Sequence, residues 1–485
     1  MKCAVLVPRI FTRVQILNNP MSEDISKGPE RFGRYKEDWA RLLCPERTKL
    51  VDGPATEDLS DKVKPLDERS PFERDYERVV FSSGFRRLAG KTQVRTFPDV
   101  DFIHNRLTHS LEVSSVARSL GDIIAKFLVQ RKDIEANRVE DICWISQAAG
   151  IAHDLGNPPY GHSGEYAIQH WARQLPKEMR IFQENEVWKD FENYDGNAQT
   201  FRILCSQETR AGNAFLFTAA SAGAVIKYPK TALEITKYDR PPKFDVFSTE
   251  IDVYKKICKK LGFSKGKCRR HPLSYLSEAA DDICYRVLDF EDAIISGVVT
   301  REIVVPIFRA GLGCSRDERE GGHVPMSKLR ARLIRQQVVD FADCFKTHYE
   351  QIMAGELKGD LRENLPAGSK TKMFLDEIGE LYDKLYTEHN KVIRECGAYS
   401  QIPLVLNRGY DFIREAFLAK TYSAEPLPPF ADLSHYSQHF IVLAWGEGYY
   451  KEKREKSFEW WMHLLLDYVV GMTDAYINML AQKLR

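Results

Sequence analysis

Histidine and aspartate side chains recur within apolar helical patterns in HNRLTHSLEV (104–113), AAGIAHDLGNPPYGHSGEYAI (148–168) and LSEAADDICYRVLDFEDAI (276–294). These segments supply two imidazoles and two carboxylates, from His109, His153, Asp154 and Asp281. Mixed nitrogen and oxygen donors suit Mn²⁺, Fe²⁺, Co²⁺ or Mg²⁺, whereas a thiolate-rich set would indicate structural zinc. The sequence therefore predicts a divalent metal site. The alternative interpretation is a set of core histidines that only form hydrogen bonds.

The segment GHSGE contains a candidate acid–base pair. His162 and Glu165 are three residues apart at the expected start of a helix, so their side chains should be neighbours. A carboxylate beside an imidazole orients it and raises its basicity, as proton transfer near neutral pH requires. In the alternative interpretation, Glu165 only complements the helix N-terminus while His162 packs against its surroundings.

The third segment repeats polar side chains every four residues. Asp281, Tyr285 and Asp289 therefore share one face of the expected helix. A carboxylate, a phenol and a second carboxylate beside apolar neighbours indicate a metal ligand next to a sugar-binding edge. A solvated stripe with a surface tyrosine is the simpler alternative.

Weaker candidates lie between these segments. ENYDGNAQTFRIL (192–204) offers Asn197 in a polar turn, and GAVIKYPK (223–230) offers Lys227, which can pair with phosphate, and Tyr228. Taken alone, each of these stretches is typical of an ordinary surface turn.

Helical periodicity of the apolar residues is the main structural signal from residue 75 onward. It predicts long helices over 107–129 and 273–295, which would carry His109 and Asp281, and further helices over 326–355, 371–396, 410–420 and 457–483. Alternating strand patterns are scarce, so the sequence predicts an all-α fold. The proline-containing stretches 228–250 and 421–434 are expected to be connections, the first of them a long connection or a lid.

The expected organisation has three parts. Residues 1–74 form an N-terminal arm, irregular over 19–70 except for a short helix near 38–43. Residues 75–300 form the catalytic core, and residues 301–485 form a C-terminal helical region packed on that core.

Composition indicates a globular protein of the cytoplasm. The chain has 485 residues, 43% hydrophobic and 29% charged, and its net charge of +1 shows no global excess of basic residues for nucleic acid. The ten cysteines are scattered without a CxxC pair, which favours unpaired thiols. No apolar run approaches the roughly eighteen residues of a membrane span, and the N-terminal run is too short for a signal peptide. We therefore expect a soluble, cytoplasmic protein without a membrane partner.

Several motifs, in order, resemble the bacterial deoxyguanosine triphosphate triphosphohydrolase (dGTPase) branch of the HD superfamily. They are FRRLAGKTQV (85–94), NRLTHSLEV (105–113), AHDLGNPPYGHSGE (152–165), DGNAQTFRIL (195–204), IKY (226–228), EAADDICYRVLDFEDAI (278–294) and GMTDAY (471–476). The block around HDLGNPPYGHSGE is long and specific. From about residue 300 to 470 the resemblance fades.

The resemblance implies an α-helical HD-domain core with the N-terminal arm and additional C-terminal helices. It implies that a divalent ion, Mg²⁺, Mn²⁺ or Co²⁺, is held by His109, His153, Asp154 and Asp281, and that His162 and Glu165 are catalytic. It also implies substrate contacts: phosphate at Arg106, Asn197, Lys227 and Tyr228, the sugar 3′-hydroxyl at Tyr285 and Asp289, and the sugar or base at Gln93.

The implied activity is hydrolysis of dGTP, with other dNTPs left open, to a deoxynucleoside and inorganic triphosphate. The implied partners are the dNTP, single-stranded nucleic acid, and other copies of the chain in a homo-oligomer such as a hexamer. Two alternatives stay open: an HD phosphodiesterase or nucleotidase with a different substrate, and a nucleic-acid-binding regulatory HD protein with weak catalysis. Asn193 and Asp195 depart from the His and Glu that the family often has there.

Overall fold

The computed structural model describes residues 32–47, 68–93, 104–205, 215–236, 242–263, 269–314, 324–393, 397–420 and 425–485. Within these ranges the regular structure is helical, and strand pairing is limited to isolated bridges such as Thr92 with Asn105. The predicted all-α class is therefore confirmed.

The α-helices follow one another through most of the described chain. The first half contains α1 (Lys36–Leu42), α2 (Pro71–Val80), α3 (Ser83–Arg87), α4 (Arg106–Gln130), α5 (Val139–Ala152), α6 (His162–Gln174), α7 (Val187–Glu192), α8 (Gly196–Cys205), α9 (Ala219–Val225) and α10 (Ile251–Lys260). The second half contains α11 (Ser274–Ile295), α12 (Arg301–Gly311), α14 (Met326–Thr347), α15 (Tyr349–Ala354), α16 (Lys370–Ile393), α17 (Tyr399–Leu418), α18 (His435–Ala444), α19 (Glu447–Glu452), α20 (Phe458–Val470) and α21 (Asp474–Leu484).

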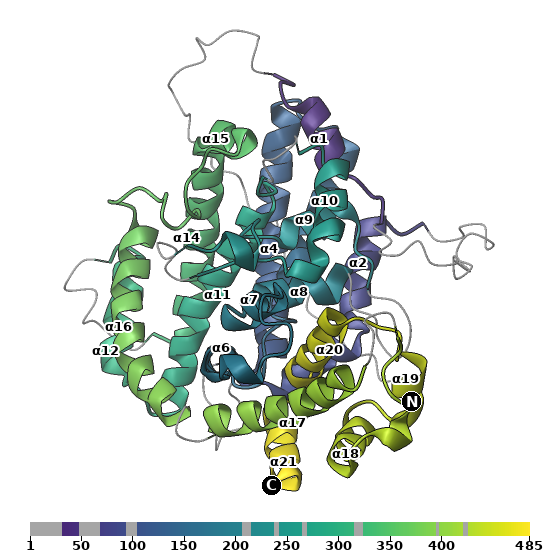
Figure 1. The fold of residues 1–485 in the computed structure, drawn as a ribbon. Helices are drawn as coiled ribbons and strands as arrows, with labels where there is room; N and C mark the ends of the chain where they lie inside the picture. Colours follow the sequence, from purple (N-terminus) through teal and green to yellow (C-terminus); the bar gives the residue numbers. More distant parts are fainter. Residues whose placement is uncertain are drawn as a thin grey trace, which may run out of the picture.

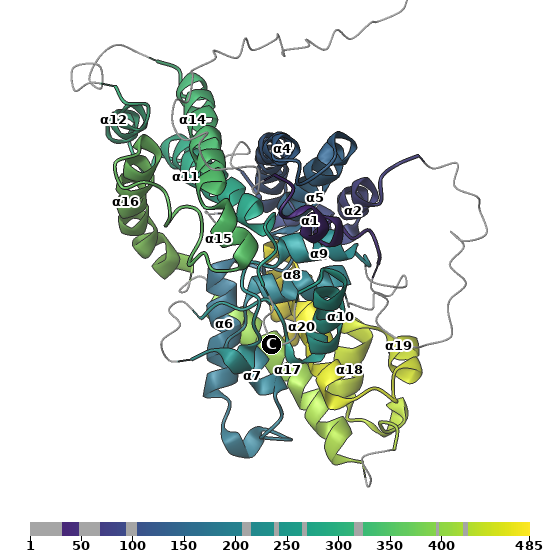
Figure 2. The ribbon, with the colours of Figure 1, turned by 90° about the horizontal axis from the view of Figure 1, so that it is seen from above.

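Helices α4, α5 and α11 pack against one another, and Figure 2 shows α4 and α5 side by side next to α11. Helix α4 starts at a capping box: the Asn105 side chain accepts the backbone N–H of Thr108, whose hydroxyl accepts the N–H of Asn105. Helices α4 and α5 approach closely at Gly150, where an added Cβ would lie 3.0 Å from Cα of Ser114. This close approach brings the start of α4 near the end of α5.

The buried apolar side chains form two clusters. One spans α4, α5 and α11 and extends to α14 and α16; the other joins α6 and α7 to α17, α20 and α21. Figures 1 and 2 both show α12, α14 and α16 grouped beside α11, with α17 to α21 gathered at another part of the molecule. Residues near 160–200 and residues after 398 therefore share one core.

Some predicted helices have different limits. The expected helices at 107–129 and 273–295 are confirmed as α4 and α11. The helical pattern over 326–355 is confirmed, and it contains two helices, α14 and α15, which are separated at His348. The helical pattern over 457–483 also contains two helices, α20 and α21, and the Thr473 side chain caps the second by accepting the N–H of Tyr476. Helix α17 begins at Tyr399, well before the predicted residue 410.

The peripheral segments agree only partly with the sequence-based expectations. The short helix expected near 38–43 is α1, whereas much of the arm at 1–31 and 48–67 lies outside the described residues. Helix α2 crosses the expected limit at residue 74, and the three-part division stays a prediction. In the 228–250 stretch, a bridge joins Thr231 to Val246, and residues 237–241 lie outside the description.

Two properties bear on the expected environment. No helix in the described part of the chain is both long and apolar enough to cross a membrane. Cys143, Cys205, Cys284 and Cys344 are buried free thiols, in line with the expectation of unpaired cysteines.

Candidate active site

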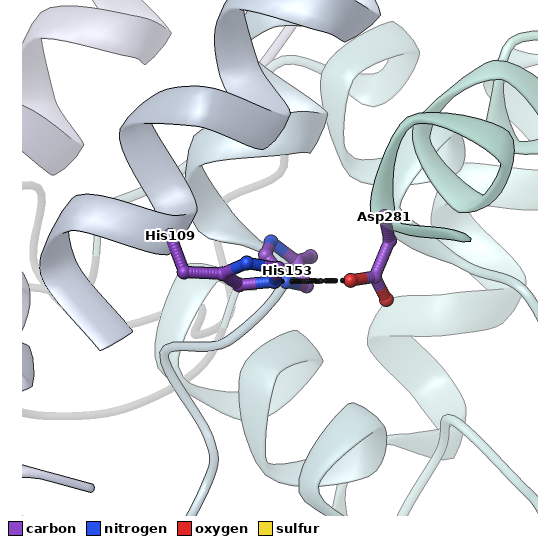
Figure 3. Close-up of side chains that lie close together, drawn as sticks. All are labelled: His109, His153 and Asp281. Carbon is purple, nitrogen blue, oxygen red and sulfur yellow. Dashed lines mark hydrogen bonds and ion pairs between the residues drawn. The ribbon is translucent and has the colours of Figure 1, made fainter. Parts of the chain in front are cut away.

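Side chains from three central elements converge at one point. His109 comes from α4, His153 lies at the C-terminal end of α5, and Asp281 comes from α11 (Figure 3). Each offers one nitrogen or oxygen ligand atom, and these atoms all lie within 4.8 Å of one another. Nε2 of His109 is 3.1 Å from Oδ1 of Asp281, and Nε2 of His153 is 3.5 Å from the same oxygen.

In His153 the ring proton is on Nδ1, so the lone pair of Nε2 is directed into this cluster. Its Nδ1 lies 2.7 Å from the carbonyl oxygen of Gly150. Because a carbonyl oxygen only accepts hydrogen bonds, Nδ1 carries the proton and Nε2 is the acceptor. Nε2 is buried and has no hydrogen-bond partner among the described residues. A ligand histidine typically donates its other N–H to a carbonyl in this way.

The surroundings of the cluster keep two of its groups, His153 and Asp281, in the forms that a cation requires. Burial lowers the pKa of His153 and so favours the neutral imidazole. Burial raises the pKa of Asp281, but the positive charge around it, including that of Lys227, outweighs burial and holds that pKa well below its usual value. Nζ of Lys227 is 3.5 Å from Oδ2 of Asp281.

Asp154, the fourth predicted ligand, is engaged by other partners. Its Oδ2 accepts from Arg106 at 2.7 Å, and its Oδ1 accepts from the Asn157 amide and lies 3.5 Å from Nε2 of His153. Although burial raises the pKa of Asp154, the charge of Arg106 and the neighbouring histidines bring it to about 2. The carboxylate is thus ionised and adjacent to the other three groups.

This donor set fits a divalent cation. Imidazole nitrogens and carboxylate oxygens are ligands for Mn²⁺, Co²⁺, Fe²⁺ and Mg²⁺, with the last preferring oxygen. The unpartnered Nε2 of His153 is the observation that a purely structural cluster leaves unexplained, because buried acceptors are normally satisfied.

His162 and Glu165 lie side by side at the first turn of α6. Nδ1 of His162 is 2.8 Å from Oε2 of Glu165, and Oε1 of Glu165 accepts the N–H of Gly196 at 2.9 Å. The His162 side chain is 61% exposed, whereas that of Glu165 is 6% exposed. Burial raises the pKa of Glu165, but the charges of Lys243 and His162 lower it to about 2. Glu165 is therefore a fixed anion that orients a solvent-accessible imidazole.

One cavity of about 300 Å³ connects these two groups. Its walls include both catalytic candidates, all four predicted metal ligands, and most of the predicted substrate contacts: Gln93, Arg106, Asn197, Lys227, Tyr228 and Tyr285. Asp289 is not among the lining residues and is buried, with 1% exposure. Eight residues of helix span about 12 Å along its axis, so Asp289 is displaced along α11 from Asp281. Its predicted contact with the 3′-hydroxyl stays a prediction.

Several of the predicted contacts have protein partners in the structure. Oε1 of Gln93 is buried and has no hydrogen-bond partner within the described part of the chain, and the Asn197 amide donates to Asp195 at 2.9 Å. The Tyr228 hydroxyl donates to Glu278 at 3.3 Å, and Tyr285 shares a hydroxyl–hydroxyl contact with Tyr382 of α16. Of these residues, Gln93 is the one with a buried polar atom left for a ligand.

Sequence reasoning missed other residues of the cavity wall. They include Lys243, Tyr382, Asn157 and Tyr160. Asn157 and Tyr160 lie inside the HDLGNPPYGHSGE block, so the motif itself was a signal for them. Lys243 follows a Pro-Pro pair and Tyr382 lies in a long helix, and neither position has a local signature.

The two departures from the family pattern have different environments. Asn193 donates to the carbonyl oxygen of Lys189 and does not line the cavity, so no second imidazole stands there. Asp195 is buried, accepts from the backbone N–H of Asn197, and lies 3.5 Å from Nζ of Lys243. The Asp195 carboxylate thus holds the ammonium group of Lys243, which lines the cavity.

Comparison with known proteins gives relatives over nearly the whole chain. A Pseudomonas aeruginosa protein described as deoxyguanosinetriphosphate triphosphohydrolase-like is 31% identical over 469 residues, which cover 92% of this chain and 98% of the relative. A Synechocystis protein of the same description is 30% identical, with coverages of 86% and 94%. For one from Listeria innocua, the identity is 28% and the coverages are 92% and 99%. No family model matches the chain.

Proposed function

The chain belongs to the deoxyguanosinetriphosphate triphosphohydrolase-like family of hydrolases, and we propose that it is a metal-dependent dNTP triphosphohydrolase. The products would be a deoxynucleoside and inorganic triphosphate. The observation that carries the proposal is the shared cavity, which joins the His109–His153–Asp281 cluster to the His162–Glu165 pair.

The cations around the cavity support a polyphosphate as substrate. A triphosphate carries several negative charges, which need compensation where the site excludes water. Lys227 and Lys243 both line the cavity, and Arg106 adds a buried guanidinium beside Asp154. We infer that the two lysines hold the phosphate chain, and that Arg106 positions Asp154 and the nearest phosphate.

The proposed proton transfer uses the free nitrogen of His162. Because Nδ1 faces Glu165, Nε2 is the atom able to give a proton to the departing 5′-oxygen. Glu165 keeps the ring oriented, and its link to the Gly196 N–H keeps the carboxylate itself in place. The Asp281 and His153 side chains would bind the ion together with His109 and Asp154.

A divalent ion held there supplies charge that stabilises the phosphoryl group and favours ionisation of a water molecule. Mg²⁺, Mn²⁺ and Co²⁺ are the proposed candidates. Preference for guanine, binding of single-stranded nucleic acid and assembly into a hexamer stay proposals that rest on the resemblance. Residence in the cytoplasm stays a proposal that rests on the composition of the chain.

The test is product analysis with the purified full-length chain. The protein is incubated with dGTP and, separately, Mg²⁺, Mn²⁺ or Co²⁺, and the products are separated by ion-exchange chromatography. We expect deoxyguanosine and triphosphate in equal amounts, with the other dNTPs and GTP run in parallel to define selectivity. Release of a deoxynucleoside monophosphate and pyrophosphate, or no turnover with any of the ions, would contradict the proposal.

A further inference from the structure

The last helix of the chain carries a buried carboxylate that contacts two segments of the cavity wall. Asp474 is the first residue of α21 and is 4% exposed. Its Oδ1 accepts the backbone N–H of Tyr160 at 2.9 Å, and its Oδ2 accepts the N–H of Thr92 at 3.0 Å together with the Thr92 hydroxyl. Both Tyr160 and Thr92 line the cavity. One side chain therefore connects segments that are distant in sequence.

The turn that Asp474 holds has an unfavourable backbone conformation. Tyr160 has a φ angle of 65°, in the left-handed region that a non-glycine residue adopts only when its surroundings require it. Its N–H is bound by Asp474, and its hydroxyl donates to Oε1 of Gln401 at 2.6 Å. These two contacts hold both ends of the Tyr160 residue and so stabilise the strained turn.

The conformation of this turn determines the position of the acid–base pair. Gly161 follows Tyr160 with a φ angle of 56°, and a side chain there would collide with the guanidinium of Arg106. His162 comes next and starts α6. A change in the Tyr160 backbone would therefore move His162 relative to Arg106 and to Asp154, the partner of Arg106.

The other contact of Asp474 fixes a second segment of the cavity wall. Thr92 directly precedes Gln93, whose buried Oε1 has no partner among the described residues. The Thr92 N–H and hydroxyl both end on the same carboxylate oxygen, which sets the direction in which Gln93 leaves the chain. A ligand group bound by Gln93 would thereby be held at a fixed distance from His162.

A separate contact joins the same regions. Nζ of Lys91 donates to the carbonyl oxygens of Asn157 at 2.6 Å and of Val470 at 2.7 Å. This lysine ties the cavity turn to the end of α20 without using Asp474. The C-terminal helices therefore stay attached when the carboxylate is changed, and the effect of such a change is local.

We propose that Asp474 is a positioning residue that holds Thr92–Gln93 and Tyr160–His162 in a fixed arrangement in the wall of the active-site cavity. Its kinetic consequence rests on the proposed function, whereas the structural role does not. This positioning role also gives a function to the motif GMTDAY (471–476), which contains Asp474 and has no part in the chemistry described above. The carboxylate is needed because each of its two oxygens accepts from a different segment, whereas an amide would turn its NH2 group, a donor, toward one of the two segments.

The direct test is hydrogen–deuterium exchange of the full-length chain. Asp474→Asn keeps the side-chain volume but replaces one acceptor with a donor. We expect exchange to accelerate about tenfold at whichever of the Thr92 and Tyr160 amides faces the new NH2 group, the factor that corresponds to the loss of one hydrogen bond. The matched control is Thr473→Ala, which removes the α21 cap and leaves the carboxylate, and should not change exchange at these amides. Unchanged exchange in Asp474→Asn would overturn the proposal.

A second variant and a second readout complete the test. Thr92→Val removes one donor to Asp474 without touching α21, so it tests the contact even if Asp474→Asn does not fold. It should accelerate exchange around residues 91–93, and unchanged exchange there would overturn the Thr92 part of the proposal.

In dGTP hydrolysis, Asp474→Asn should lower kcat/KM by about 10²-fold, as displacement of a reacting group does, with bound metal unchanged and Thr473→Ala near wild type. Equal losses in both variants would show that α21 stability alone matters and would overturn the positioning role. If the wild-type chain hydrolyses no dNTP, the proposed function fails, and the exchange experiments still decide whether Asp474 holds the two segments.

Discussion

Oε2 of Glu165 lies 2.8 Å from Nδ1 of His162, while the other oxygen of the same carboxylate accepts the N–H of Gly196. Glu165 is thus fixed by the start of α8 and in turn fixes the imidazole at the start of α6. This arrangement leaves the second ring nitrogen of His162 for proton transfer.

The first prediction concerns this pair. His162→Ala should lower kcat for dGTP by about 10² to 10⁴, the usual contribution of a positioned acid–base group. Bound metal and thermal stability should stay unchanged, because the side chain is 61% exposed and contacts no predicted ligand. Glu165→Gln should give a smaller loss. Turnover close to wild type, or loss of metal, would exclude His162 as the acid–base residue.

The second prediction concerns metal binding. Asp281→Asn should abolish it, because the neutral amide removes a charge next to His109 and His153. In the wild type, Mn²⁺ at about 100 times its Kd should stabilise the fold by about 2.7 kcal/mol, which is measured as a rise in Tm alongside the metal content.

Asp282→Asn is the matched control for this experiment. Asp282 does not line the cavity, its Oδ1 lies 3.8 Å from Arg362, and burial raises its pKa to about 7. If Asp281→Asn retains the metal and Asp282→Asn loses it, the ligand is Asp282 and not Asp281.

The third prediction concerns the sugar. Tyr285 lines the cavity one helical turn after Asp281, so a sugar beside the bound phosphate should meet its ring. Tyr285→Ala should lower the ratio of kcat/KM for dGTP to kcat/KM for GTP. The factor by which this ratio falls should be larger than the factor by which dGTP hydrolysis slows. Tyr382→Phe is the control, because it removes only the hydroxyl that contacts Tyr285. An unchanged ratio in Tyr285→Ala would place sugar selection elsewhere.

The fourth prediction concerns pH and stability at His104. Hydrogen bonds to Asp292 and Glu112 raise the pKa of His104 from 6.5 to about 10. A group whose pKa is higher in the folded than in the unfolded protein stabilises the folded state. This stabilisation is complete at pH values below the pKa of the unfolded protein, and it is lost as the pH rises through the pKa of the folded protein. His104→Gln should therefore lower Tm most at pH 6, and the difference from wild type should shrink between pH 6.5 and 10.

The exposed His439 is the control position, because His439→Gln makes the same substitution at a site outside the His104 contacts. A difference that stays constant from pH 6 to pH 10 for His104→Gln would show that His104 is not charged in the folded protein.

Features that depend on near neighbours in sequence were predictable. The 3.6-residue periodicity gave the limits of α4 and α11 within a residue or two, because each face of a helix repeats locally. The contact between His162 and Glu165 was predictable because residues three positions apart on a helix are neighbours. The likeness of motifs gave the family, since long blocks such as HDLGNPPYGHSGE are specific in composition and order.

Features that depend on distant contacts were not predictable from local patterns. Spacing placed Asp281, Tyr285 and Asp289 on one face, yet the cavity includes only the first two, because its extent is limited by the elements packed around α11. The break between α20 and α21 depended on one capping side chain, Thr473, within an otherwise helical pattern.

By itself, the sequence determined the helical class, the family and the chemical types of the candidate ligands, since these follow from local periodicity and residue order. The tertiary structure decided which side chains meet: Lys243 with Asp195, Tyr382 with Tyr285, and Asp474 with Thr92 and Tyr160. Such contacts join positions up to 382 residues apart. They depend on how the helices pack, which is the sum of many weak apolar contacts distributed over the whole chain.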